Sequence, residues 1–133
     1  MATLREKVVK RARGKCEYCL APQSVTGYAF HLEHILPRSQ QGKDAFSNYA
    51  LACANCNFSK SNHVTGEDPA TGRQEPLFNP RKDDWGKHFK FSKTTGMITG
   101  RTATGRATEG RLRLNDAKQL EARALWIELG IYP

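Results

Sequence analysis

The chain has 133 residues, of which 38% are hydrophobic and 26% charged, a composition that suits one globular domain. Lysine and arginine number 21 against 13 acidic residues, and the resulting net charge of +8 favours a polyanionic partner such as nucleic acid. A solvated basic surface without such a partner would explain the charge equally well. No apolar run is long enough to span a bilayer, and the basic N-terminus lacks the apolar centre of a signal peptide. We therefore expect a cytosolic protein with no membrane partner.

The first elements are predicted to be a helix and a strand. Thr3 and Glu6 have the spacing of a capping box, which favours a helix over residues 3–13. Gly14 is expected to end that helix. Apolar and polar residues alternate over residues 28–34, which predicts a half-buried strand with Glu33 on its polar face.

Further along the chain, the pattern predicts a strand, a helix, a long connection, a hairpin and two helices. In that order they cover residues 49–53, 54–62, 62–80, 88–100, 104–114 and 116–130. The connection contains three prolines and two glycines, so we expect order there only where it packs back on the rest of the chain. Gly105 and Gly110 are expected to weaken the helix that contains them. The sequence thus predicts an α+β protein with a single domain over residues 1–133.

Four cysteines form two knuckles, Cys16 with Cys19 and Cys53 with Cys56, separated by 33 residues. Two such pairs are typical of zinc sites, because both sulfurs of a knuckle face one point and four thiolates complete a tetrahedral shell. With no coordination position left open, we expect a structural Zn²⁺ ion. Unpaired buried cysteines or a redox-active pair are the alternatives.

Between the knuckles, the segment HLEHILPRS contains two histidines and a carboxylate within four residues. Glu33 and His34 stand at the end of the predicted strand, Asn48 follows His34 by 14 residues, and Asn57 follows Asn48 by nine. Each side chain alone would more often be structural or a turn or helix cap. Their combination beside two zinc knuckles favours a catalytic site.

This arrangement resembles the HNH nuclease family. The resemblance is carried by EHILPRSQQG, Asn48, LACANCN and Lys60, over about residues 15–61. It implies a ββα-metal core at about residues 15–62, stapled by a four-cysteine zinc site. An N-terminal helix would precede the core, and an extension with a hairpin and a helix would follow at about residues 76–133.

The resemblance also implies metal-dependent hydrolysis of DNA phosphodiester bonds. His34 would be the general base, since a neutral imidazole accepts a proton from water near neutral pH. Glu33 and the amide oxygen of Asn57 would hold one divalent cation near the leaving oxygen. Asn48 would bond across the loop and orient His34.

Oxygen ligands and open coordination positions favour Mg²⁺ or Mn²⁺ as the catalytic ion. His31 shares the face of Glu33 and is either a further ligand or a surface residue. As a ligand, it would shift the preference toward Mn²⁺, Ni²⁺ or Zn²⁺. Arg38, Lys60 and Ser61 are candidate contacts for phosphate, and a solvated surface is the alternative for all three.

Two other functions stay open. The chain could be a zinc-stapled DNA-binding module without catalysis, or a nuclease that works only within a larger assembly, such as phage defence or phage packaging. Because a double-strand cut usually needs two active sites, a homodimer is also compatible with the sequence.

Overall fold

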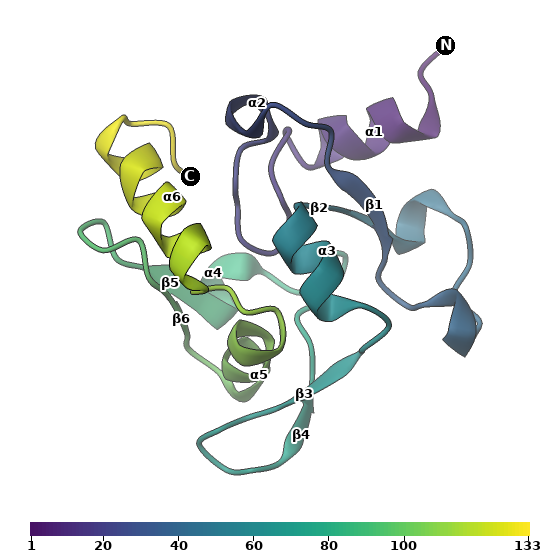
Figure 1. Cartoon of the computed structure of the whole chain (residues 1–133). Helices are drawn as coiled ribbons and strands as arrows, with labels where there is room; N and C mark the ends of the chain where they lie inside the picture. The colour runs from purple at the N-terminus through teal and green to yellow at the C-terminus, as the bar shows by residue number, and fades with distance from the viewer.

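The computed structural model describes all 133 residues and contains helices with three separate small sheets (Figure 1). The helices are α1 (Leu4–Arg11), α2 (Gln23–Thr26), α3 (Ala54–Lys60), α4 (Trp85–His88), α5 (Ala103–Arg111) and α6 (Ala117–Glu128), with 3-10 helices η1 (Arg38–Gln40) and η2 (Phe46–Asn48). The strands are β1 (His31–His34), β2 (Tyr49–Ala52), β3 (Thr65–Glu67), β4 (Gln74–Pro76), β5 (Phe89–Phe91) and β6 (Ile98–Gly100). Each sheet is one antiparallel pair, so the predicted α+β class is confirmed.

The N-terminal helix begins where the capping pattern predicted. The side chain of Thr3 accepts a hydrogen bond from the N–H of Glu6 at 3.1 Å. The guanidinium of Arg11 donates to the backbone carbonyls of Phe46 and Tyr49 at 2.8 and 2.6 Å, and Val8 is fully buried. These contacts fix α1 across the start of β2.

The strands β1 and β2 pair with α3 following directly, which is the ββα order expected from the sequence (Figure 1). His34 lies opposite Tyr49 in the register. The strand β1 is shorter than predicted, and the prediction that Glu33 lies on an exposed polar face was wrong. Glu33 is 4% exposed while His31 on the same expected face is exposed, because Glu33 finds polar partners in the interior.

The long connection is ordered because it packs back, as the sequence required. The strands β3 and β4 form a hairpin that packs against α5. The buried carboxylate of Asp68 accepts two hydrogen bonds from the guanidinium of Arg106 at 2.8 and 2.9 Å. This ion pair ties the hairpin to the helix.

The C-terminal extension contains the predicted hairpin, formed by β5 and β6, and two of the predicted helices. One core cluster of buried residues draws on both halves of the chain, from Val8 to Leu114. The indole N–H of Trp85 donates to the carbonyl of Tyr18 at 2.8 Å, and the hydroxyl of Tyr132 donates to the carbonyl of Cys19 at 2.8 Å. Both bonds connect the extension to the first cysteine knuckle.

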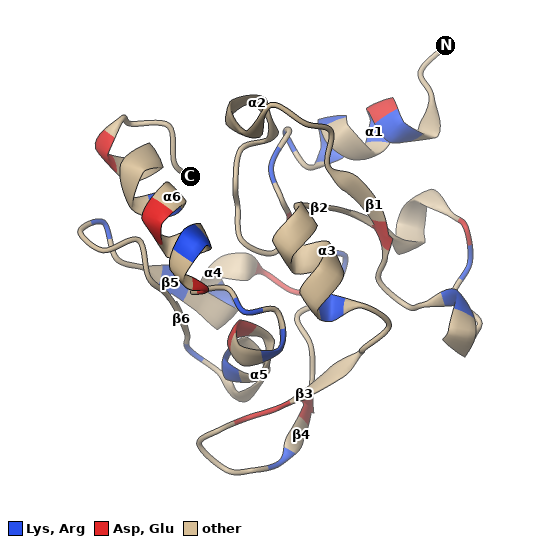
Figure 2. Ribbon diagram, viewed as in Figure 1, with Lys and Arg blue, Asp and Glu red and all other residues tan.

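The charged residues do not gather on one element. Figure 2 shows lysine and arginine on α1, α6 and several loops, with acidic residues between them. The net charge alone therefore does not identify a binding face. None of the helices has the length and apolar character needed to cross a membrane.

Candidate functional site

The two cysteine knuckles come together in the core. Cys16 and Cys19 follow α1, whereas Cys53 caps the N-terminus of α3 and Cys56 lies in its first turn. All four are buried, and their sulfurs lie within 4.8 Å of one another. In each knuckle the N–H of the second cysteine points at the sulfur of the first, at 3.5 and 3.4 Å.

This cluster fits a metal ion such as Zn²⁺. Four sulfurs about 2.3 Å from a tetrahedral zinc ion would be separated by about 3.8 Å, and those of Cys19 and Cys53 are 3.6 Å apart. Hydrogen bonds with Cys16 and the other two thiols lower the pKa of Cys53, while a bond with Cys16 is the main cause that raises the pKa of Cys19. A divalent cation in the cluster would favour the thiolate form of the cysteines.

A second group of predicted residues lines an open cavity of about 220 Å³ between the end of β1, η1 and α3. Its lining includes Glu33, His34, Arg38, Asn57 and Ser61. The fold therefore brings residues from three separate segments together around one cavity.

The imidazole of His34 is partly exposed at the edge of this cavity. Its Nε2 lies 2.8 Å from Oδ1 of Asp44, and its ring packs against Tyr49 with centroids 4.8 Å apart. Nδ1 has no hydrogen-bond partner in the protein. One ring nitrogen is thus held in place while the other is free for chemistry.

Asn48 bonds across the loop between β1 and β2, but not to His34. Its Oδ1 accepts from the N–H of Leu36 at 2.9 Å. Its Nδ2 donates to the carbonyls of Leu36 and Lys43, each at 2.9 Å. Asn48 therefore closes the loop that contains Asp44.

The carboxylate of Glu33 is held from two sides. The hydroxyl of Tyr18 donates to Oε2 at 2.7 Å, and the ammonium of Lys60 donates to Oε1 at 2.5 Å and to the carbonyls of His34 and Ile35. Burial raises the pKa of Glu33, and the charge of Lys60 opposes that shift. Each oxygen of this carboxylate accepts one side-chain hydrogen bond and keeps a second lone pair, and Glu33 lines the cavity.

The remaining predicted residues differ in accessibility. The amide of Asn57 has no hydrogen-bond partner, which leaves it available to a ligand in the cavity. His31 is exposed and is not among the lining residues. Arg38 and Ser61 are exposed, but Lys60 is 2% exposed, so in this structure it is not a surface contact for phosphate.

Comparison with known proteins agrees with this geometry: residues 16–63 match the family model described as HNH endonuclease. Residues 16–63 form an HNH domain. The chain is also 27% identical, over 121 residues, to Septu protein PtuB of Bacillus mycoides strain KBAB4. That match covers 72% of this chain but only 40% of the relative's length. No solved structure is significantly similar to the chain.

The sequence did not single out two polar residues that contact the HNH site, Tyr18 and Asp44. Tyr18 lies inside the first knuckle, where it reads as a spacer residue, and its hydroxyl bond to Glu33 depends on the folded position of β1. Asp44 lies in a polar loop ten residues after His34, and no periodicity marks it. Spacing alone does not predict either contact.

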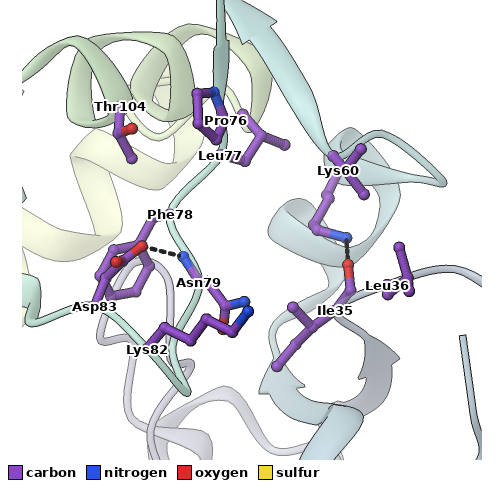
Figure 3. Close-up of a pocket in the computed structure, with 11 residues that line it drawn as sticks. Ile35, Leu36, Lys60, Pro76, Leu77, Phe78, Asn79, Lys82, Asp83 and Thr104 are labelled. Carbon is purple, nitrogen blue, oxygen red and sulfur yellow. Dashed lines mark hydrogen bonds between the residues drawn. The ribbon is translucent and has the colours of Figure 1, made fainter.

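A second cavity of about 440 Å³ lies between the HNH domain and the extension (Figure 3). Ile35, Leu36 and Lys60 line one side, and the segment 76–83 with Thr104 lines the other. Lys60 borders this cavity, while Glu33, to which it is bonded, borders the first. The Lys60–Glu33 ion pair therefore lies between the two spaces.

Proposed function

We propose that this protein is a metal-dependent endonuclease that hydrolyses DNA phosphodiester bonds, with His34 as the general base. The observation that carries the proposal is the cavity beside β1, whose lining includes His34, Asn57 and Glu33. Nδ1 of His34 and the amide of Asn57 make no hydrogen bond within the protein. In this proposal Zn²⁺ on the four cysteines is structural, and the HNH match supports the reaction class.

The chemistry follows from what the residues can do. Nδ1 of His34 takes a proton from water, the water oxygen bonds to phosphorus, and the bond from phosphorus to the leaving oxygen breaks. A divalent cation such as Mg²⁺ or Mn²⁺ would supply positive charge to the developing oxyanion. Asn57 through its amide oxygen and Glu33 through its carboxylate would hold that cation. In this proposal Arg38 and Ser61, which line the same cavity, contact the phosphate.

The experiment is nicking of supercoiled plasmid by the zinc-loaded chain with Mg²⁺, Mn²⁺, Ni²⁺ or EDTA. His34→Ala should lower the cleavage rate by about 10²–10⁴-fold, the usual contribution of a general base. His63→Ala is the matched control, because His63 is exposed and lies outside the cavity lining. Zinc content and melting temperature should be the same in all three proteins. Cleavage by His34→Ala at the normal rate would reject the assignment.

A nuclease that works only within a larger assembly is the second candidate. It is supported by one observation: the chain spans 40% of the length of the relative that it matches. This candidate predicts that the isolated chain binds DNA without cutting it, and that cleavage sensitive to His34→Ala returns when a partner is added. Cleavage by the isolated chain would rule it out.

A further inference from the structure

Asp44 makes a bridge between the HNH site and a surface arginine. Its Oδ1 lies 2.8 Å from both Nε2 of His34 and Nε of Arg38, and its Oδ2 accepts from Nη2 of Arg38 at 2.8 Å. A bidentate guanidinium fixes the plane of a carboxylate. Asp44 is therefore presented to the imidazole in one orientation although it is solvent-exposed.

The loop around Asp44 is built to hold it there. Asn48 donates to the carbonyl of Lys43, the residue before Asp44, at 2.9 Å. Gly42 lies so close to the start of the loop that a Cβ at this position would be 1.7 Å from the carbonyl oxygen of Leu36. Gly42 thus lies close to Leu36, and Asn48 bonds to both Leu36 and Lys43.

The bond between Asp44 and His34 decides which ring nitrogen holds the proton. A carboxylate only accepts hydrogen bonds, so Nε2 must be the donor and must be protonated. In a neutral imidazole, Nδ1 is then the basic nitrogen. Hydrogen bonds from Arg38, and then His34, lower the pKa of Asp44 to about 2, so Asp44 remains ionised at neutral pH.

We propose that Asp44 is a positioning residue: it holds His34 in the tautomer protonated at Nε2 and so keeps Nδ1 as the proton acceptor. This inference rests on the proposed function and deepens it. It also gives Asn48 a defined part, because Asn48 acts on His34 through Lys43 and Asp44 rather than by direct contact.

The test uses the zinc-loaded full chain, two Asp44 variants and one control variant, and the same kinetic and NMR measurements are made on each. Asp44→Ala removes the acceptor, and Asp44→Asn keeps an oxygen that can accept from Nε2. Asp84→Ala is the matched control, since Asp84 is also exposed and its side chain makes no cap hydrogen bond. The measurements are kcat and KM for plasmid nicking, and the tautomer of His34 by long-range ¹H–¹⁵N NMR.

In wild type and in the control, we expect His34 protonated at Nε2. Asp44→Ala should give a mixture of tautomers and lower kcat by about 10–100-fold with KM unchanged, as loss of an orienting partner does. Asp44→Asn should keep more of both the tautomer and kcat than Asp44→Ala. If Asp44 had only a structural role, its replacement would change the melting temperature, but Asp44→Asn would not keep more of the tautomer and of kcat than Asp44→Ala.

Two results would overturn the inference: a kcat of Asp44→Ala equal to that of Asp84→Ala, or an unchanged His34 tautomer in Asp44→Ala. If wild type cuts no DNA with any cation, the proposed function fails. The NMR comparison still decides in that case whether Asp44 sets the tautomer, so the two failures are distinguishable.

Discussion

Lys60 is a lysine in an unusual place for its type, because its side chain is 2% exposed and its ammonium has three acceptors. One acceptor is the carboxylate of Glu33, and the others are the carbonyls of His34 and Ile35. The end of α3 is thereby joined to the end of β1. At the scale of single residues, this ion pair fixes the geometry from which His34 projects.

Lys60→Met should lower the free energy of unfolding by about 3–5 kcal/mol, because it leaves the Glu33 carboxylate buried without its cation. Lys118→Met is the control: Lys118 is 89% exposed in a 3.9 Å pair with Glu121, and its replacement should have almost no effect. Urea denaturation measures both. If Lys60→Met is as stable as the control, the ion pair does not stabilise the fold as the structure implies.

The loss in Lys60→Met should also depend on pH. Burial raises the pKa of Glu33, and Lys60 opposes that shift, so removing Lys60 raises the pKa further. A carboxyl with a raised folded pKa contributes most stability below its unfolded value, ordinarily 4.5, and loses it as pH rises through the folded pKa. The variant should therefore be closest to wild type at acidic pH.

For single residues, the sequence predicted those positions that follow from spacing along the chain. It did not predict those that depend on contacts between residues far apart in the sequence. The spacing of the knuckles predicted four sulfurs around one point, and the structure has them within 4.8 Å. Lys60 was predicted at the surface because helix periodicity does not reveal a partner 27 positions away. Asp44 went unpredicted because its contact with His34 depends on the path of the loop.

At the scale of elements, α5 and β6 approach each other through two glycines. A Cβ on Gly105 would lie 2.1 Å from the carbonyl oxygen of His88, and a Cβ on Gly100 would lie 2.3 Å from the N–H nitrogen of Arg106. The sequence predicted that Gly105 weakens its helix. The structure adds the reason for its presence, which is that a side chain at Gly105 has no space beside the end of α4 and the end of β6.

Gly105→Ala should destabilise the fold although alanine is the better helix former, because the added methyl group has no space. Gly110→Ala is the matched control in the same helix, since nothing lies within 4 Å of its Cβ position. The control should gain up to about 1 kcal/mol from helix propensity. Thermal denaturation of both variants gives the comparison, and a gain in Gly105→Ala would contradict the close approach of α5 to the end of α4.

Helices and strands that are marked by short-range sequence patterns were predicted well. Those that form only because they pack against another element were not. The cap of α1 and the hairpin of β5 and β6 follow from short-range patterns, and both are present. The hairpin of β3 and β4 was expected only as a connection, because each strand has three residues and depends on α5 for support. Strand length in β1 also depends on pairing with β2 rather than on alternation alone.

At the scale of the whole molecule, the extension is bonded to the first cysteine knuckle at both of its ends. Trp85 bonds to Tyr18, and Tyr132 bonds to Cys19. Metal binding to four thiolates contributes on the order of 10–16 kcal/mol in small zinc modules, which is comparable with the whole stability of a domain. The folding of the extension should therefore depend on metal binding by the four cysteines, although none of these cysteines lies in the extension.

This dependence can be measured with one tryptophan as the reporter. The chain has two tryptophans, so a Trp126→Phe background leaves only Trp85, whose indole N–H contacts the knuckle. Addition of a zinc chelator should release one Zn²⁺ ion per chain, shift the Trp85 emission to longer wavelength and remove helical circular dichroism. All three changes should share one midpoint, because the knuckles and the extension share one core.

Two further measurements complete this test. Added Zn²⁺ should restore all three signals, and added Mg²⁺ should restore none, because four sulfur ligands bind a soft or borderline ion in preference to a hard one. An unchanged Trp85 emission after zinc release would mean that the extension is stable on its own. Two separate midpoints would mean that residues 1–133 fold as two units, against the single domain that the sequence predicts.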